Sequence, residues 1–117
     1  MSKYADKTEP DINKLVAERL GMKTASLPIG RDKFEIIVIN DEANKFRQFD
    51  PCNNPTDAWP IILEYKIGIN TIGIKGDEDR VWWAELTFDV YGDNHYAEDK
   101  NPLRAAMIVY LMMEGEL

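Results

Sequence analysis

Two Asn-Pro pairs, Asn54-Pro55 and Asn101-Pro102, constrain the fold of this chain more than any other feature. An asparagine side chain caps the unpaired N–H groups at the start of a helix. Proline suits the first helical position because it has no N–H to leave unpaired. We therefore predict helices over Thr56–Lys66 and Leu103–Glu114. The second segment is apolar nearly all round, which is typical of a helix buried in the centre of a fold or of a dimer.

The remaining periodic segments predict an N-terminal helix and three strands. An amphipathic helix follows Asp11, which we predict as its N-cap, and stops near Gly21. Lys33–Asn40 has β-branched residues on both faces, which favours a strand covered on both sides. The segments Ile69–Lys75 and Arg80–Tyr91 alternate apolar with polar residues around a Gly-Asp turn, so they predict a β-hairpin.

The predicted fold class is α+β: a small, mainly antiparallel sheet packed by the two Asn-Pro-initiated helices, with the N-terminal helix at the side. The polar segments Asp41–Gln48 and Gly92–Lys100 are predicted as loops. A chain of 117 residues fits one domain, over residues 1–117. Residues 1–9 are predicted to form a flexible tail, and they lack the apolar stretch of a signal peptide.

Charge and composition exclude several classes of partner. Lys and Arg number 14 and Asp and Glu number 21, so the net charge of −7 repels duplex nucleic acid and anionic membranes and attracts basic protein surfaces. The longest apolar run, Ala105–Met113, is shorter than the roughly 20 residues that span a membrane. Cys52 and His95 are the single cysteine and the single histidine. They cannot form a disulfide or a Cys/His zinc site, so we expect no metal and no cofactor.

The start of the last helix is the main candidate site. Helix N-termini attract anions, yet Lys100 and Arg104 place two cations there, which the helix dipole disfavours. A phosphate bound between them would resolve this conflict. A structural alternative is an ion pair between Arg104 and Asp57, joining the first turns of the two helices. The phosphate hypothesis assigns ligand-binding roles to Asn53, Asn54, Lys100, Asn101 and Arg104.

Two tryptophans are candidates for stacking on a ligand. Strand alternation puts Trp83 on the polar face of its strand, and Trp59 lies near the first Asn-Pro pair. Either ring can stack on a base or sugar, or simply pack inside the protein. Cys52 also has a functional and a structural interpretation: it is a nucleophile beside a helix start, or it is a small buried residue. His95 is predicted in a loop, and no acid, base or nucleophile set is legible, so we do not expect an enzyme.

Two segments carry a resemblance to a known family. Phe49–Ile62 (FDPCNNPTDAWPII) and Asn101–Met113 (NPLRAAMIVYLMM) resemble the NinX-like family of small bacteriophage and prophage proteins. The resemblance implies a phage accessory protein that acts in the cytoplasm of the host bacterium. The family is one of unknown function, so the resemblance implies no activity and no catalytic residues.

Two functions from different classes remain open. The first is a non-enzymatic counter-defence protein that sequesters a small phosphate-bearing ligand, such as a nucleotide immune signal, with Trp59 or Trp83 stacking on it. The second is an acidic inhibitor or nucleic-acid mimic that neutralises a basic host defence protein, with its net charge steering the encounter. A homo-oligomer is also predicted, because the last helix is so strongly apolar.

Overall fold

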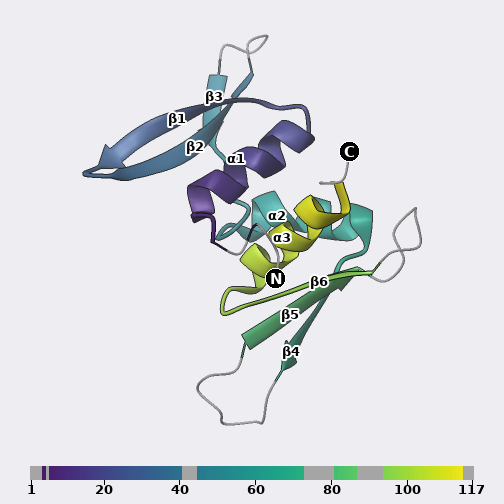
Figure 1. The fold of residues 1–117 in the computed structure, drawn as a ribbon. Coiled ribbons are helices and arrows are strands. Elements are labelled where there is room, and N and C mark those ends of the chain that lie inside the picture. Colours follow the sequence, from purple (N-terminus) through teal and green to yellow (C-terminus); the bar gives the residue numbers. More distant parts are fainter. Residues whose placement is uncertain (1–3, 5, 41–44, 73–80, 87–93, 115–117) are drawn as a thin grey trace.

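The computed structural model describes residues 4, 6–40, 45–72, 81–86 and 94–114. These residues form helices and two three-stranded antiparallel sheets, which confirms the α+β class (Figure 1). The helices are α1 (Glu9–Arg19), α2 (Pro55–Tyr65) and α3 (Pro102–Glu114). The strands are β1 (Lys23–Gly30), β2 (Lys33–Asn40), β3 (Lys45–Gln48), β4 (Gly68–Ile72), β5 (Val81–Leu86) and β6 (His95–Asp99).

The helices lie between the two sheets, as Figure 1 shows. One sheet has the order β1-β2-β3 and packs its β1 and β2 strands against α1. The other has the order β4-β5-β6 and packs against α3. Since α3 also contacts α1 and α2, it is the element that joins both halves of the fold.

Both Asn-Pro pairs begin helices, as predicted. The side chain of Asn54 accepts a hydrogen bond from the backbone N–H of Thr56 at 2.9 Å, and Pro55 is the first residue of α2. The side chain of Asn101 caps α3 by the same chemistry. The N-cap of α1, however, is Thr8, whose hydroxyl accepts from the N–H of Asp11 at 3.3 Å. The prediction that Asp11 itself caps this helix was therefore wrong.

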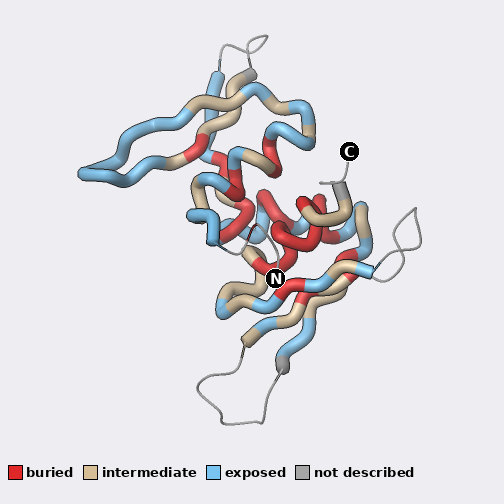
Figure 2. Tube along the Cα trace, viewed as in Figure 1, coloured by how far each residue is buried: buried red, intermediate tan, exposed pale blue. Residues whose placement is uncertain are grey.

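Helix α3 is buried within a single chain. Residues 105–111 are each between 0 and 2% exposed, and Figure 2 shows the buried residues gathered where the helices meet. Tyr110 of α3 packs against Tyr65 of α2 with ring centroids 5.0 Å apart. The all-round apolar character of α3 is thus satisfied by α1, α2 and the β4-β5-β6 sheet. It requires no second copy of the chain.

Two strands occupy segments that were predicted as loops. Lys45–Gln48 forms β3 and pairs with β2, and His95–Asp99 forms β6 and pairs with β5. Both are short, polar edge strands, so their conformation depends on backbone bonds to a neighbour and not on a local apolar pattern. His95 consequently lies in a strand. The predicted hairpin is confirmed as β4 and β5, whereas residues 73–80 and 87–91 of the predicted segments lie outside the described part of the chain.

The prediction that Lys33–Asn40 is covered on both faces was wrong. Within β2, Ile36 is buried and Val38 packs against the core, while Ile37 and Ile39 on the other face are only half-buried. Among the described residues, α1 covers one side of this sheet. Part of the predicted N-terminal tail contacts the body of the fold, since Tyr4 is 5% exposed and joins the core.

Candidate functional site

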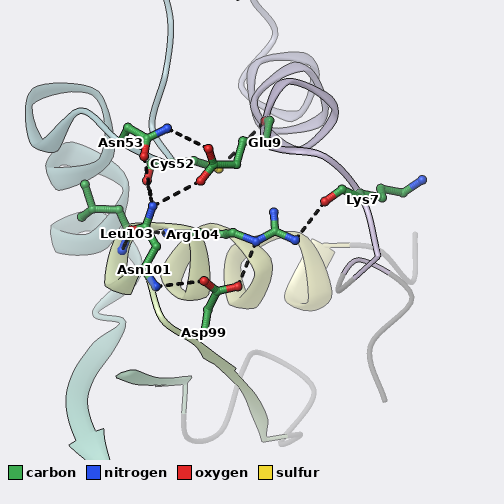
Figure 3. Close-up of polar contacts among 8 residues, drawn as sticks. All are labelled: Lys7, Glu9, Cys52, Asn53, Asp99, Asn101, Leu103 and Arg104. Atoms are coloured by element: carbon green, nitrogen blue, oxygen red, sulfur yellow. Dashed lines mark hydrogen bonds and ion pairs between the residues drawn. The ribbon is translucent and has the colours of Figure 1, made fainter. Parts of the chain in front are cut away.

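The starts of the three helices meet in one polar network, which we call the helix-start network (Figure 3). Asn101 is its centre. Its side-chain NH₂ group donates to the carbonyl of Cys52, to Asn53 Oδ1 at 3.1 Å and to Glu9 Oε2 at 3.3 Å. Its side-chain oxygen accepts from the N–H groups of Leu103 at 2.9 Å and Arg104 at 3.3 Å. One asparagine thus caps α3 and ties it to the segment before α2 and to α1.

Arg104 is held by groups of the protein itself. Its Nε donates to Asp99 Oδ2 at 2.9 Å, and its Nη2 donates to the carbonyl of Lys7 at 2.9 Å. The other carboxylate oxygen of Asp99 accepts from the N–H of Asn101 at 2.9 Å. Asp99 therefore supplies the negative charge that a cation and a helix N-terminus both favour. The positive charge of Arg104, which suggested a phosphate ligand, is paired here with the carboxylate of Asp99 from β6.

The predicted ion pair between Arg104 and Asp57 was wrong. Asp57, which is 7% exposed, instead receives Arg47 Nη1 from β3 at 2.7 Å and the backbone N–H of Asp50 at 3.0 Å. Asp57 and Arg104, the charged residues in the first turns of α2 and α3, each form an ion pair, Asp57 with Arg47 and Arg104 with Asp99. Both partners come from strands that the sequence pattern did not predict.

A second asparagine anchors the same segment to α1. Asn13 is 4% exposed, donates to Asp50 Oδ1 at 2.8 Å and accepts from the N–H of Cys52 at 3.1 Å. The sequence interpretation missed this residue. A signal was present, because Asn13 adjoins Ile12 and lies one turn before Val16 in the apolar stripe of α1. A polar residue in such a stripe is buried only when its hydrogen bonds are satisfied. Sequence reasoning also missed Glu9, Arg47, Asp50 and Asp99.

Neither tryptophan of the predicted site makes a hydrogen bond to the helix-start network. Trp59 is 53% exposed on the outer side of α2. Trp83 lies on the face of its sheet that points away from α3, as alternation predicted, since Ala84 is buried against the core. The ring of Trp83 stacks on that of Tyr96 with centroids 4.4 Å apart, and its Nε1 donates to Glu85 Oε2 at 3.2 Å.

The predicted ligand-binding residues therefore divide into separate places. Asn53, Asn101 and Arg104 are brought together in the helix-start network, and Asn54 caps α2 nearby. Lys100 is exposed just before α3. The two stacking residues are not brought to one place, since Trp59 lies on α2 and Trp83 on β5.

Cys52 is a buried structural residue. It is 0% exposed, and burial raises the pKa of its thiol above the ordinary value of 9.0, with nearby Glu9 adding to the effect. A protonated thiol is a poor nucleophile, so this environment favours the packing interpretation. Within the described ranges, no three His, Cys, Asp or Glu side chains are arranged to hold a metal ion. Within the same ranges, no helix has the length and apolar character needed to cross a membrane.

A groove runs between the first half of α1 and the β1–β2 hairpin. It consists of two adjoining pockets of about 160 and 520 Å³, which share Pro10, Ile29, Phe34 and Ile36. Its acidic lining residues outnumber its basic ones, with Glu9, Asp11, Asp32, Glu35 and Asp50 against Lys14 and Lys33. Of the predicted site residues, Asn53 lines the smaller pocket.

Within the described residues, two carboxylates that line this groove, those of Glu9 and Asp50, accept hydrogen bonds from amides and form no ion pair. Glu9 accepts from the side chains of Asn53 at 3.1 Å and Asn101 at 3.3 Å. Asp50 accepts from Asn13 at 2.8 Å and Asn53 at 3.2 Å. Amide donors orient a carboxylate without cancelling its charge. We call this groove the acidic groove. Its carboxylates keep their negative charge, and they lie beside the apolar side chains that the two pockets share.

These features define a small α+β domain whose helix starts are joined by amides and which carries an acidic groove beside α1. The chain belongs to the family described as Bacteriophage P22, NinX, which it matches over residues 3–114. The resemblance seen in the two Asn-Pro segments is thereby confirmed. No curated protein matches the chain.

The chain is also similar to a solved structure, a 2.0 Å crystal structure of a phage protein from Bacillus cereus ATCC 14579. The TM-score is 0.62 and the sequence identity is 15%, over 93% of this chain and 89% of the other. At this identity the likeness shows a shared fold.

Proposed function

We propose that this phage protein acts in the host cytoplasm by binding a basic host protein, with the acidic groove as its binding surface. The observation that carries the proposal is the composition of that groove. Acidic residues outnumber lysines along its walls, and exposed apolar side chains lie beside them. A partner segment with Lys or Arg side chains next to apolar ones matches both properties.

Apolar contact area and charge have separate roles in this binding. Ile29 is 56% exposed and Phe34 is 50% exposed, so both have area to bury against a partner. The net charge of −7 steers a basic partner toward the protein and raises the association rate. We expect the affinity to fall steeply with added salt, because exposed charges are screened beyond roughly 8 Å at physiological ionic strength.

The alternative, sequestration of a small phosphate-bearing ligand, has less support from the contacts. Its main cation, Arg104, already binds Asp99 and the carbonyl of Lys7. The first N–H groups of α3 already bond to Asn101. A phosphate at this position would have to displace a carboxylate that is held by two hydrogen bonds. Exposed Lys100 alone offers weak, non-specific attraction.

Site-specific photo-crosslinking in infected cells tests the proposal. A photoreactive residue replaces Phe34 in the acidic groove, and the matched control replaces Leu63, which is 57% exposed on α2. A basic host protein crosslinked from position 34 and not from position 63 supports the proposal. An acidic or neutral crosslinked protein, or equal yield from both positions, contradicts it. Mass spectrometry of small molecules released from the purified protein supports the phosphate alternative if a nucleotide is found.

Charge variants test the same surface with the purified partner. Asp11→Asn/Asp32→Asn removes two charges from the groove, and asparagine tolerates the positive φ of 58° at position 32. Glu18→Gln/Glu64→Gln removes two charges from exposed positions that do not line the groove. We expect about 10-fold weaker binding for the first pair, at roughly 0.7 kcal/mol per charge, and little change for the second. Equal effects would show that only the net charge matters.

A further inference from the structure

The outer face of the β4-β5-β6 sheet carries a group of aromatic and acidic side chains. The inner face packs against α3, since Ala84 of β5 and Ala97 of β6 are buried in the core. Residues that alternate with these two alanines point to the opposite side of the sheet. We call that side the Trp-Tyr face, and its members with described side chains are Gly68, Asn70, Val81, Trp83, Glu85, Tyr96 and Glu98.

Strand register makes two aromatic rings and two carboxylates neighbours on the Trp-Tyr face. Trp83 is paired with Glu98, and Glu85 is paired with Tyr96, across β5 and β6. The rings of Trp83 and Tyr96 stack along one diagonal of this square, with centroids 4.4 Å apart and an angle of 8° between their planes. The two glutamates therefore lie on the other diagonal, one on each side of the stacked rings.

The rings and the carboxylates both retain capacity to bind a ligand. Tyr96 is 57% exposed although one side of its ring covers Trp83, so the other side of the ring is open. Glu85 Oε2 accepts from Trp83 Nε1 at 3.2 Å, a bond that orients the carboxylate and leaves its charge. Glu98 is exposed, and within the described residues it forms no hydrogen bond and no ion pair.

No cation among the described members of the Trp-Tyr face balances these two glutamates. Lys66 and Lys100 are the basic residues next to the ends of β4 and β6, and both lie outside the strands. Neither lysine forms a described ion pair with Glu85 or Glu98. The face thus joins an open aromatic ring to two negative charges that this part of the chain leaves without a counter-ion.

We infer that the Trp-Tyr face binds an arginine side chain of a partner protein. Charge complementarity selects a cation, because the charged members of the face are two glutamates on a protein of net charge −7. The aromatic ring selects a guanidinium among cations. Its plane stacks on a ring, and its N–H groups point outward in that plane toward carboxylates beside the ring. A nucleotide is disfavoured, since its phosphates would meet the same carboxylates.

The Trp-Tyr face is separate from the acidic groove. The helices lie between the two sheets, and the groove is formed by α1 and the β1–β2 hairpin, whereas the Trp-Tyr face is the side of the other sheet that points away from α3 (Figure 1). The inference therefore does not rest on the function proposed above for the groove.

Titration of the ¹⁵N-labelled full chain with short peptides, followed by NMR, tests this inference. The probes are two acetylated and amidated tripeptides, Gly-Arg-Gly and Gly-Lys-Gly, which differ only in the cation. The indole N–H resonance of Trp83, assigned by its loss in Trp83→Phe, reports on the Trp-Tyr face. That of Trp59, which is 53% exposed on α2, is the internal control. We expect the arginine peptide to shift the Trp83 resonance saturably, with about 5-fold tighter binding than the lysine peptide, and to leave Trp59 unchanged.

A pair of charge variants tests the role of the carboxylates. Glu85→Gln/Glu98→Gln removes both charges, and glutamine at position 85 keeps an oxygen that accepts from Trp83 Nε1. Glu18→Gln/Glu64→Gln is the matched control, since it removes two charges from exposed positions on α1 and α2. We expect the first pair to weaken binding of the arginine peptide about 10-fold and the control to change it little.

Four results would overturn the inference. The first is no saturable shift of the Trp83 resonance with the arginine peptide. The second is equal affinity for both peptides, which would mean that charge alone attracts them. The third is an equal effect of the two variant pairs. The fourth is tighter binding of a neutral sugar, N-acetylglucosamine, which would identify a carbohydrate platform. The comparison of peptides uses the wild-type chain, so it holds even if a variant fails to fold. Peptide bound in the acidic groove instead would leave the Trp83 resonance unshifted.

Discussion

Replacing Asn101 with alanine is expected to destabilise the protein by about 2–3 kcal/mol, whereas replacing Asn54 is expected to cost about 1 kcal/mol. The two residues begin helices by the same chemistry. Asn54 is exposed, and its side chain accepts one hydrogen bond, from the N–H of Thr56. Removing it therefore costs about one N-cap, which is typically ~1 kcal/mol.

Asn101 carries additional bonds. Its oxygen accepts from two N–H groups of α3, and its NH₂ group donates to the carbonyl of Cys52 and to Asn53 and Glu9. Alanine removes the cap, worth ~1 kcal/mol, and leaves the Cys52 carbonyl without this donor, at about 1–2 kcal/mol more. Asn101→Asp keeps the cap acceptor but places a carboxylate against Glu9 and the carbonyl of Cys52.

Urea denaturation monitored by circular dichroism measures these differences, with the change in midpoint multiplied by the common slope. We expect Asn101→Asp to be destabilised as much as Asn101→Ala, because repulsion from Glu9 cancels the benefit of the retained cap. Equal losses of unfolding free energy for Asn101→Ala and Asn54→Ala would refute the argument that the helix-start network joins the helices. Such a result would mean that both residues act only as helix caps.

Three further predictions concern individual contacts. We expect Asp57→Ala to cost about 2–3 kcal/mol and Arg47→Ala less than about 1 kcal/mol in urea denaturation, because Asp57 is buried and also accepts from the N–H of Asp50, whereas the Arg47 side chain is 56% exposed. The reverse order would contradict this assignment. Asn13→Ala leaves Asp50 and the N–H of Cys52 without their partner, so we expect a loss of about 2 kcal/mol, against almost none for exposed Lys14→Ala. Because burial raises the thiol pKa of Cys52 above 9.0, stability is unaffected by this group below pH 9.0 and falls above it by about 1.4 kcal/mol per pH unit, as the unfolded thiol ionises and the folded one does not. The difference between wild type and Cys52→Ala in alkaline denaturation measures this term, and parallel pH curves would refute it.

The sequence was sufficient to predict elements whose signals are local. Asn-Pro pairs followed by helical periodicity located α2 and α3 to within a residue at each end. The β-branched run predicted β2, and the alternation of apolar and polar residues around Ala84 predicted β5. The same alternation placed Trp83 correctly on the face opposite Ala84. These predictions succeeded because capping and periodicity act between residues a few positions apart.

Non-local contacts could not be predicted in this way. The strands β3 and β6 form because they pair with β2 and β5, and their own polar residues give no strand signal. The partner of Arg104 was misassigned although Asp99 lies only five residues before it, because the segment that ends in Asp99 was predicted as a loop and not as a strand. An ion pair is chosen by distance in space, and that distance depends on the strand.

The sequence by itself determined that two asparagines and two prolines begin helices, that α3 is apolar nearly all round and that the chain is acidic. The tertiary structure alone decided what those features serve. It placed α3 between α1, α2 and a sheet, so that its apolar surface is buried within one chain. It also brought Asp99 to Arg104 and Glu9 to Asn101, so that two residues of the predicted anion site are bonded to carboxylates of the protein. Helix starts are set by neighbours in sequence, but the charges that satisfy them come from whichever segments the packing of the core brings near.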